Sequence, residues 1–273
     1  MNFSKAVVIY KISDEDVLYL TRDAEMFSKV YIYDNSPEVT PQSLKENFKE
    51  FNNIVYIEDE NNNGLANAYN VVIERAIKDK MDFLMLMDQD SDLDLLSVEL
   101  LQNFCLYKDI RRIALVCPFV QDWDGKFDNK KSKKVFWAIN SGTVLNLKII
   151  EKEQLRYDLN YFVDRTDLDF CKQVKRKHYE IWKVGGTHLH QKVGYLVNGQ
   201  AVHSPIRHYY MERNRLYYNY KFYSLPIRWM LNVLESARHY YYICMTDPNN
   251  KYENKKMFKR GIMDYFKGIT GKV

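Results

Sequence analysis

The sequence lacks any apolar run long enough to span a bilayer, and it has only 4 cysteines among 273 residues. A membrane-spanning helix needs about 20 consecutive apolar residues, so none is expected. The cysteines are scattered and form no C-x-x-C pair, which argues against a disulfide framework or a thiolate zinc site. The first residues carry no apolar signal-peptide core, which favours a cytoplasmic location.

The sequence also lacks a strong excess of one charge, with Lys+Arg 40 against Asp+Glu 36. The basic excess is concentrated in residues 251–273, whose net charge is +5, so the first 250 residues are close to neutral. Met, Phe and Ile stand between the charges of this tail. That pattern favours a peripheral contact with an anionic membrane, and a solvated terminal helix is the alternative.

Short apolar runs alternate with helical patterns over the first hundred residues. The predicted strands are 6–10, 30–33, 54–57 and 83–87. Residues 65–77 repeat apolar side chains at a spacing of 3.6, which predicts a helix. This alternation predicts an α/β fold with a mostly parallel central sheet flanked by helices.

The second half of the chain has a looser pattern. A polar loop at 121–134 is expected to be a flap or an insertion. From about residue 205 the chain is Tyr-rich, basic and helical, which predicts a C-terminal helical extension. Its apolar stripe at 225–241 is expected to pack on the rest of the protein or to form a homodimer interface.

Polar segments follow each predicted strand, where ligands of α/β sheets bind. Asp88 and Asp90 follow the strand at 83–87 in a D-x-D pattern, and such carboxylates can bind Mg²⁺ or Mn²⁺ together with phosphate oxygens. A calcium loop is the alternative, but Leu93 stands where that loop requires glycine. Ser91 and Asp92 are expected to cap a helix that begins at residue 93.

A second acidic cluster contains Asp164, Asp167 and Asp169. One of these carboxylates can act as a general base toward an attacking hydroxyl. The alternative is helix capping together with a surface pair to Arg165. A third polar segment contains His188 and His190. Histidine is a common metal ligand and base, a structural or surface pair is the alternative, and at most one of the two is expected to point into a site.

Several segments in order along the chain resemble motifs of the inverting glycosyltransferases of family 2, in particular their bacterial rhamnosyltransferase-like branch. They are the V-I-Y at 8–10, D-N-S at 34–36, N-G-L-A-N-A-Y-N at 63–70, D-Q-D-S at 88–91, N-S-G-T at 140–143, F-V-D-R-T-D-L-D-F-C at 162–171, H-Q-K-V-G at 190–194, H-S-P-I-R-H-Y-Y at 203–210 with R-N at 213–214, and the segment 261–272. Together they cover nearly the whole chain.

The resemblance implies a GT-A fold, a divalent metal and a nucleoside-diphosphate sugar donor carrying dTDP or UDP. It divides the chain into a catalytic domain over 1–204, with a donor half to about residue 95 and an acceptor half over 96–204, and an extension over 205–273. It implies that Asp90 binds the metal with help from His190, and that Asp167 is the general base. The remaining donor-binding residues that it implies are Tyr10, Asp34, Asn63, Asn67, Asp88 and Arg213.

The implied reaction is a single displacement that inverts the sugar carbon, with rhamnose as the favoured sugar. The acceptor would be a glycan or a polyprenyl-diphosphate-linked oligosaccharide, which suits an enzyme at the cytoplasmic face of the membrane. Two other classes remain open. A nucleotidyltransferase normally has a glycine-rich phosphate loop after its first strand, and residues 11–14 contain no glycine. A nucleic-acid-binding protein would be more strongly basic, so no nucleic acid is expected as a partner.

Overall fold

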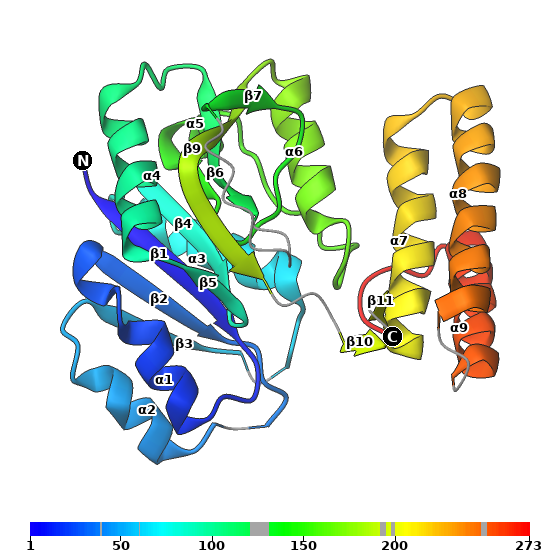
Figure 1. Cartoon of the computed structure of the whole chain (residues 1–273), viewed down its shortest axis with the longest axis horizontal. Helices are drawn as coiled ribbons and strands as arrows, with labels where there is room; N and C mark the ends of the chain where they lie inside the picture. Colours follow the sequence, from blue (N-terminus) through cyan, green and yellow to red (C-terminus); the bar gives the residue numbers. More distant parts are fainter. Residues whose placement is uncertain (39, 60, 121–130, 192–194, 198–199, 247–249) are drawn as a thin grey trace. The chain divides into compact units, whose positions relative to one another are not determined.

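The computed structural model describes residues 1–38, 40–59, 61–120, 131–191, 195–197, 200–246 and 250–273. These residues form two compact units, and each is coloured by its place in the sequence in Figure 1. The first unit contains residues 1–158 and 167–192, and the second contains residues 159–166 and 193–273. The predicted loop at 121–134 lies outside the described residues except for its last four positions. The predicted functional division at residue 204 stays a prediction.

A curled sheet forms the centre of the first unit (Figure 1). Its strands are β1 (Phe3–Ile9), β2 (Lys29–Asp34), β3 (Ile54–Glu58), β4 (Phe83–Asp88), β5 (Ser91–Leu93), β6 (Ile113–Val120), β7 (Lys133–Val135), β8 (Val144–Asn146) and β9 (Glu180–Gln191). The order is β3-β2-β1-β4-β8-β6-β9-β5, and β7 pairs with β9.

Helices cover both faces of this sheet, as expected for an α/β fold. The helices of the first unit are α1 (Asp14–Thr21), the 3₁₀ turn η1 (Ala24–Met26), α2 (Gln42–Lys49), α3 (Leu65–Lys78), α4 (Leu95–Tyr107), α5 (Leu147–Lys152) and α6 (Thr166–Arg176). Buried side chains of α3, α5 and α6 belong to one apolar core, and those of α1, α2 and α4 belong to a second core.

The strands divide their side chains between these two cores by simple alternation. In β1, Ala6 and Val8 belong to the core beneath α3, whereas Val7 and Ile9 belong to the core beneath α1. This follows from the two-residue period of a strand. Because both faces are covered, β1 is buried along its whole length, which explains the continuous apolar runs of the sequence.

The sheet is parallel over β3-β2-β1-β4 and again between β6 and β9, whereas β5, β7 and β8 pair antiparallel with their neighbours. The predicted α/β fold is therefore confirmed. One expectation about the edge of the sheet is wrong. Residues 91–93 form the edge strand β5, paired with β9, and not a helix cap. The cap of α4 is Asp94, whose carboxylate accepts the Ser97 N–H at 2.6 Å.

The second unit contains the hairpin β10 (Tyr195–Val197) and β11 (Gln200–Val202), with the helices α7 (Pro205–Phe222), α8 (Leu225–Thr246) and α9 (Lys251–Phe266). Gly261 on α9 meets α7 closely, since a Cβ there would lie 2.7 Å from the Tyr209 carbonyl oxygen. On α8, Trp229 and Tyr241 of the predicted apolar stripe are 68% and 66% exposed. The stripe is therefore a surface of this helix. No helix within the described ranges has the length and hydropathy needed to cross a bilayer.

Candidate active site at the carboxyl ends of β1, β2 and β4

The acidic turn after β4 lies where the strand register predicts a ligand site. Asp88 ends β4 opposite Val8 of β1, and Asp34 ends β2 opposite Ile9 of the same strand. Parallel pairing therefore brings both carboxylates to one edge of the sheet. Asp90 lies in the exposed turn between β4 and β5.

Three groups orient the Asp88 carboxyl and its backbone. The buried Tyr69 hydroxyl on α3 donates to Oδ1 at 3.0 Å. The Gln191 amide at the end of β9 donates to Oδ2 at 3.3 Å. The Asp88 N–H donates to Oγ of the buried Ser141 at 3.1 Å. Asp88 is thus fixed by three elements that are far apart in the sequence.

Negative charge accumulates around Asp88. Burial raises its pKa to about 6, and the charges of Asp90 and Asp167 add to this rise, while the Tyr69 hydrogen bond lowers it. Asp167 therefore lies near enough to Asp88 for their charges to interact. A divalent cation would relieve this repulsion, because it favours the ionised form of each carboxylate.

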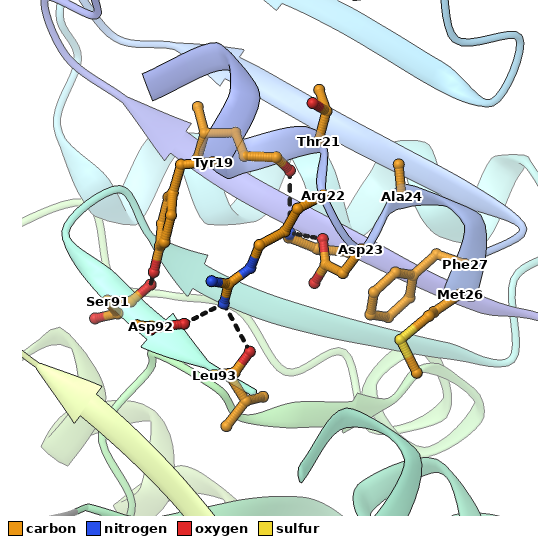
Figure 2. Close-up of polar contacts among 12 residues, drawn as sticks. Tyr19, Thr21, Arg22, Asp23, Ala24, Met26, Phe27, Ser91, Asp92 and Leu93 are labelled. Atoms are coloured by element: carbon orange, nitrogen blue, oxygen red, sulfur yellow. Dashed lines mark hydrogen bonds and ion pairs between the residues drawn. The ribbon is translucent and has the colours of Figure 1, made fainter. Parts of the chain in front are cut away.

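Helix α1 anchors the edge strand that follows the acidic turn (Figure 2). The Tyr19 hydroxyl donates to the Ser91 carbonyl at 2.6 Å. The Arg22 guanidinium pairs with the Asp92 carboxylate and donates to the Leu93 carbonyl at 3.0 Å. Tyr19 on α1 and Arg22, the residue that follows α1, therefore contact each residue of β5 and hold the far end of the turn that carries Asp90.

Asp34 is buried and fully engaged by hydrogen bonds at the end of β2. Its Oδ1 accepts the Ser36 N–H at 3.0 Å, and its Oδ2 accepts the Thr40 hydroxyl and, at 2.5 Å, the Tyr56 hydroxyl. Burial acts to raise the pKa of Asp34, but these bonds outweigh it, so the pKa is lowered. The ionised carboxylate orders the loop after β2, and contact with a nucleotide base stays a prediction.

The two predicted asparagines lie beside a further carboxylate, Asp59, at the end of β3. The Asn63 side-chain amide donates to Asp59 at 2.9 Å, and the Tyr33 hydroxyl donates to it at 2.8 Å. The Asn67 amide in turn donates to the Tyr33 hydroxyl at 3.1 Å. Asp34, Asp59 and Lys45 also line one hollow. The two predicted asparagines are thus linked to each other through Asp59 and Tyr33.

Tyr10 joins the ends of β1 and β4. Its backbone N–H donates to the Gln89 side-chain oxygen at 2.8 Å, and its ring is half exposed. The next residue, Lys11, has a φ of +52° and donates its N–H to the Ser36 hydroxyl at 2.9 Å. The backbone after β1 is therefore tied to the loops that carry Asp88 and Asp34.

The three candidate bases lie in different surroundings. Asp169 is fully buried and accepts the Gln173 amide at 2.6 Å. Asp164 belongs to the second unit and pairs there with Arg207. Asp167, in the first turn of α6, is partly exposed and interacts electrostatically with Asp88. Of the three carboxylates, Asp167 is the one that is both partly exposed to solvent and near enough to Asp88 in the acidic turn for their charges to interact.

The residues at the turn are compatible with a divalent metal that also binds phosphate, since Mg²⁺ commonly uses one or two carboxylates and takes its other ligands from phosphate and water. Within the described ranges, no group of three His, Cys, Asp or Glu side chains is close enough to hold an ion by itself. His190 is exposed on β9, and its neighbour Gln191 is the residue that reaches Asp88. A role for His190 at the metal therefore stays a prediction.

Arg213 lies inside the second unit and is 1% exposed. Its guanidinium donates to Asn214 at 3.1 Å, to the Tyr209 hydroxyl at 3.2 Å and to the Gly271 carbonyl at 2.7 Å. It also lines a cavity of about 350 Å³ whose walls include Tyr217 and other aromatic residues of α7 and α9. These contacts make Arg213 a packing residue of this unit, and its predicted contact with a diphosphate remains untested.

Sequence reasoning missed the side chains that support Asp88. Tyr69, Ser141 and Gln191 are separated from it by 19, 53 and 103 positions. All three stand within the family motifs, at 63–70, 140–143 and 190–194, which was an available signal. Tyr69 also has the apolar spacing of α3, and its hydrogen-bonding role could not be read from that spacing.

The sheet, its covering helices and the acidic strand-end turn define a GT-A-type α/β protein. Two solved structures share this fold. Staphylococcus aureus TarS residues 1–349 in complex with UDP-GlcNAc has a TM-score of 0.60 at 14% identity, and the match covers 98% of this chain and 82% of that 1–349 chain. GalNAc-T7 with UDP, GalNAc and Mn²⁺ has a TM-score of 0.59 at 12% identity, covering 97% of this chain and 55% of that protein.

The family itself follows from a sequence comparison. The model of glycosyl transferase family 2 matches residues 25–177, more than half of the chain. The protein belongs to this family and is a glycosyltransferase. A comparison with curated proteins found no match. The family assignment removes the support for the nucleotidyltransferase and nucleic-acid-binding alternatives.

Proposed function

We propose that this glycosyltransferase transfers a sugar from a dTDP- or UDP-linked donor to a hydroxyl group of a glycan or a polyprenyl-diphosphate-linked oligosaccharide, with inversion at the sugar carbon. Rhamnose is the favoured sugar, on the basis of the motif resemblance. The observation that carries the proposal is the strand register that brings Asp34 and Asp88 to one edge of the sheet, beside the turn that contains Asp90. The charge of Asp167 also acts on Asp88.

Each carboxylate has a separate part in this proposal. Asp167 accepts the proton of the attacking hydroxyl, because it is partly exposed and lies in the first turn of α6. Asp88 and Asp90 provide the carboxylates that would hold a divalent cation beside the leaving diphosphate. Tyr69 and Gln191 keep Asp88 in place. A covalent nucleophile is not required for a single displacement.

Asp90 and Asp88 would hold Mg²⁺ or Mn²⁺, with His190 as a proposed supporting residue. When bound, such a cation stabilises the negative charge of the leaving diphosphate. Two proteins of the same fold bind ligands of the proposed kinds: the GalNAc-T7 structure contains Mn²⁺, and the TarS structure contains UDP-GlcNAc. These ligands are consistent with a divalent metal and a nucleotide-sugar donor.

The C-terminal helices are the proposed contact with an anionic membrane at its cytoplasmic face. On α9, Lys255, Lys259 and Arg260 stand among Met263 and Phe266, both of which are exposed. Exposed aromatic and basic side chains on one helix suit the interface of a bilayer. The exposed stripe on α8 is an alternative homodimer surface.

The base assignment can be tested with Asp167→Asn. We expect transfer to fall by about 100-fold or more, because the general base is lost. Stabilisation of the folded protein by nucleotide and Mn²⁺, measured as a thermal shift, should be unchanged. The donors for the assay are dTDP-rhamnose and UDP-GlcNAc, with donor hydrolysis and transfer measured together.

Asp14→Asn on α1 serves as the matched control, since Asp14 is exposed and the described structure assigns it no hydrogen bond. Full turnover by Asp167→Asn would refute the base assignment. A wild-type enzyme that shows the same activity in EDTA would refute the metal assignment.

A further inference from the structure

The second unit contains a cavity of about 350 Å³ that the proposed chemistry does not use. It is lined by α7, α9 and the segment that follows α9, and the two helices lie side by side in Figure 1. Small-molecule sites typically have volumes of about 300–1,000 Å³. Four aromatic side chains form much of the wall, namely Tyr217 and Tyr220 of α7 and Tyr265 and Phe266 of α9. The cavity therefore offers a mainly apolar surface to a ligand.

Arg213 gives this wall a positive charge. Among the described residues that line the cavity, it alone is charged. Its guanidinium donates to Asn214, to the Tyr209 hydroxyl and to the Gly271 carbonyl, which are all uncharged groups. A guanidinium has five N–H donors, so these bonds leave one N–H on each of its two terminal nitrogens. Within the described ranges, no carboxylate forms an ion pair with Arg213.

The carboxylate that adjoins this network is already paired elsewhere. Asp264 accepts the Tyr209 hydroxyl at 3.1 Å, and it pairs with Arg260 at 3.4 Å and with Lys267 at 3.8 Å. Buried charges in proteins are normally paired with an opposite charge. Because a guanidinium matches the oxygens of phosphate with parallel hydrogen bonds, a phosphate in the cavity would supply the partner that Arg213 lacks.

A second cation and two exposed aromatic rings stand at the edge of the cavity. The Arg228 guanidinium on α8 lies 4.9 Å from the centre of the Tyr220 ring, and no carboxylate of the described residues pairs with it. Tyr220 is 59% exposed and Phe266 is 79% exposed. The cavity is thus open to solvent on an apolar side that carries positive charge, which suits an anionic ligand with a hydrocarbon chain.

The wall that follows α9 is fixed by hydrogen bonds. The Gly268 N–H donates to the Tyr265 carbonyl at 3.0 Å, and the Gly271 N–H donates to the Asn160 carbonyl at 2.9 Å. Gly268 has a φ of +72°, and a Cβ there would meet no atom within 4 Å. The space beside this glycine is therefore open while its backbone is held, and a cavity that is already formed costs less free energy to occupy.

We propose that this cavity binds the prenyl diphosphate part of a lipid-linked acceptor, with a phosphate on Arg213 and the start of the hydrocarbon chain against the aromatic wall. An uncharged sugar would leave the charge of Arg213 unpaired, and a phosphate without a chain would leave the aromatic wall in water. This inference rests on the proposed function, because that function supplies the prenyl-linked acceptor.

The test is calorimetric titration of the full chain with geranyl diphosphate, without divalent metal, compared with geraniol and with inorganic pyrophosphate. We expect geranyl diphosphate to bind the wild type at least tenfold more tightly than either fragment. Phe266→Glu should weaken this binding at least tenfold, because it removes part of the apolar wall and places a negative charge at the edge of the cavity. Phe266 is exposed, so its replacement should not impair folding.

Tyr252→Glu is the matched control, since Tyr252 is a 77% exposed aromatic residue of α9 that does not line the cavity. It should bind as the wild type does. Arg213→Gln should also bind at least tenfold more weakly. Thermal melts establish folding, and if Arg213→Gln does not fold, the comparison with geraniol decides whether the charge is needed.

The inference is overturned if geranyl diphosphate does not bind, if geraniol or pyrophosphate binds as tightly, or if Phe266→Glu binds normally. It is also overturned if UDP displaces geranyl diphosphate, which would assign the cavity to the donor. Equally tight binding of dihexanoylphosphatidylglycerol would overturn it as well, by assigning the cavity to bilayer lipid. Failure of the proposed function would appear separately, as no stabilisation by nucleotide with Mn²⁺ and no donor hydrolysis.

Discussion

Replacing Asp88 with asparagine should stabilise the protein and at the same time impair donor binding. Burial together with Asp90 and Asp167 raises the pKa of Asp88 from 3.8 to about 6. A shift of about 2 pKa units corresponds to about 3 kcal/mol between the two protonation states. Ionising Asp88 at neutral pH therefore opposes folding by about that amount, and Asp88→Asn removes the penalty while its amide oxygen can still accept the Tyr69 hydroxyl.

The raised pKa of Asp88 also determines how the stability of the wild type changes with pH. The folded protein holds the Asp88 proton more tightly than the unfolded chain, so its stability falls as the pH rises from about 4 to about 6 and stays low above that range. The advantage of Asp88→Asn over the wild type should be near zero at pH 4 and reach about 3 kcal/mol above pH 7. For a chain of this size, that corresponds to roughly 5–10 °C in melting temperature.

Urea unfolding of both proteins between pH 4 and pH 8, without nucleotide or metal, measures this difference. Asp14→Asn is again the control and should follow the wild type at every pH. An Asp88→Asn protein that is no more stable than the wild type at pH 7.5, or a stability difference that does not change with pH, would refute the reasoning. Addition of UDP and Mn²⁺ should then stabilise the wild type more than the variant.

Three further predictions concern the surroundings of the site and the second unit. Asp34→Ala should lower the free energy of unfolding by about 3 kcal/mol in urea at pH 7, because it leaves buried donors unsatisfied, and a loss below 1 kcal/mol would contradict this. Tyr19→Phe removes the bond to the Ser91 carbonyl and should speed amide exchange at 91–93 in hydrogen-exchange mass spectrometry, whereas unchanged exchange there would disprove the anchoring role of α1. Glu212→Gln breaks a buried ion pair with Arg215 and should destabilise the chain by about 3–5 kcal/mol. Replacing both partners with methionine should restore much of that stability in urea unfolding, and equal losses in the single and double variants would contradict the pairing.

Local patterns were sufficient to predict many of the elements of the first unit. The apolar runs at 6–10 and 83–87 correspond to β1 and β4, and the helical spacing at 65–77 corresponds to α3. The edge strand β5 was missed because its three residues have no pattern of their own. Its conformation depends on pairing with β9 and on the hydrogen bonds from α1, both of which are distant in sequence.

Backbone periodicity and hydropathy act over a few residues, so they are enough to define the alternation of strands and helices, the polar strand ends and the D-x-D turn. Which of these groups become neighbours depends on how the chain folds in three dimensions. Folding joined Asp88 to Tyr69 and Gln191, left Asp90 exposed, and brought Asp164 to Arg207. Burial and the distance to other charges set the pKa of a carboxylate, and burial can also leave a polar atom without a hydrogen-bond partner. Burial and distance alike depend on packing between segments that are remote along the chain.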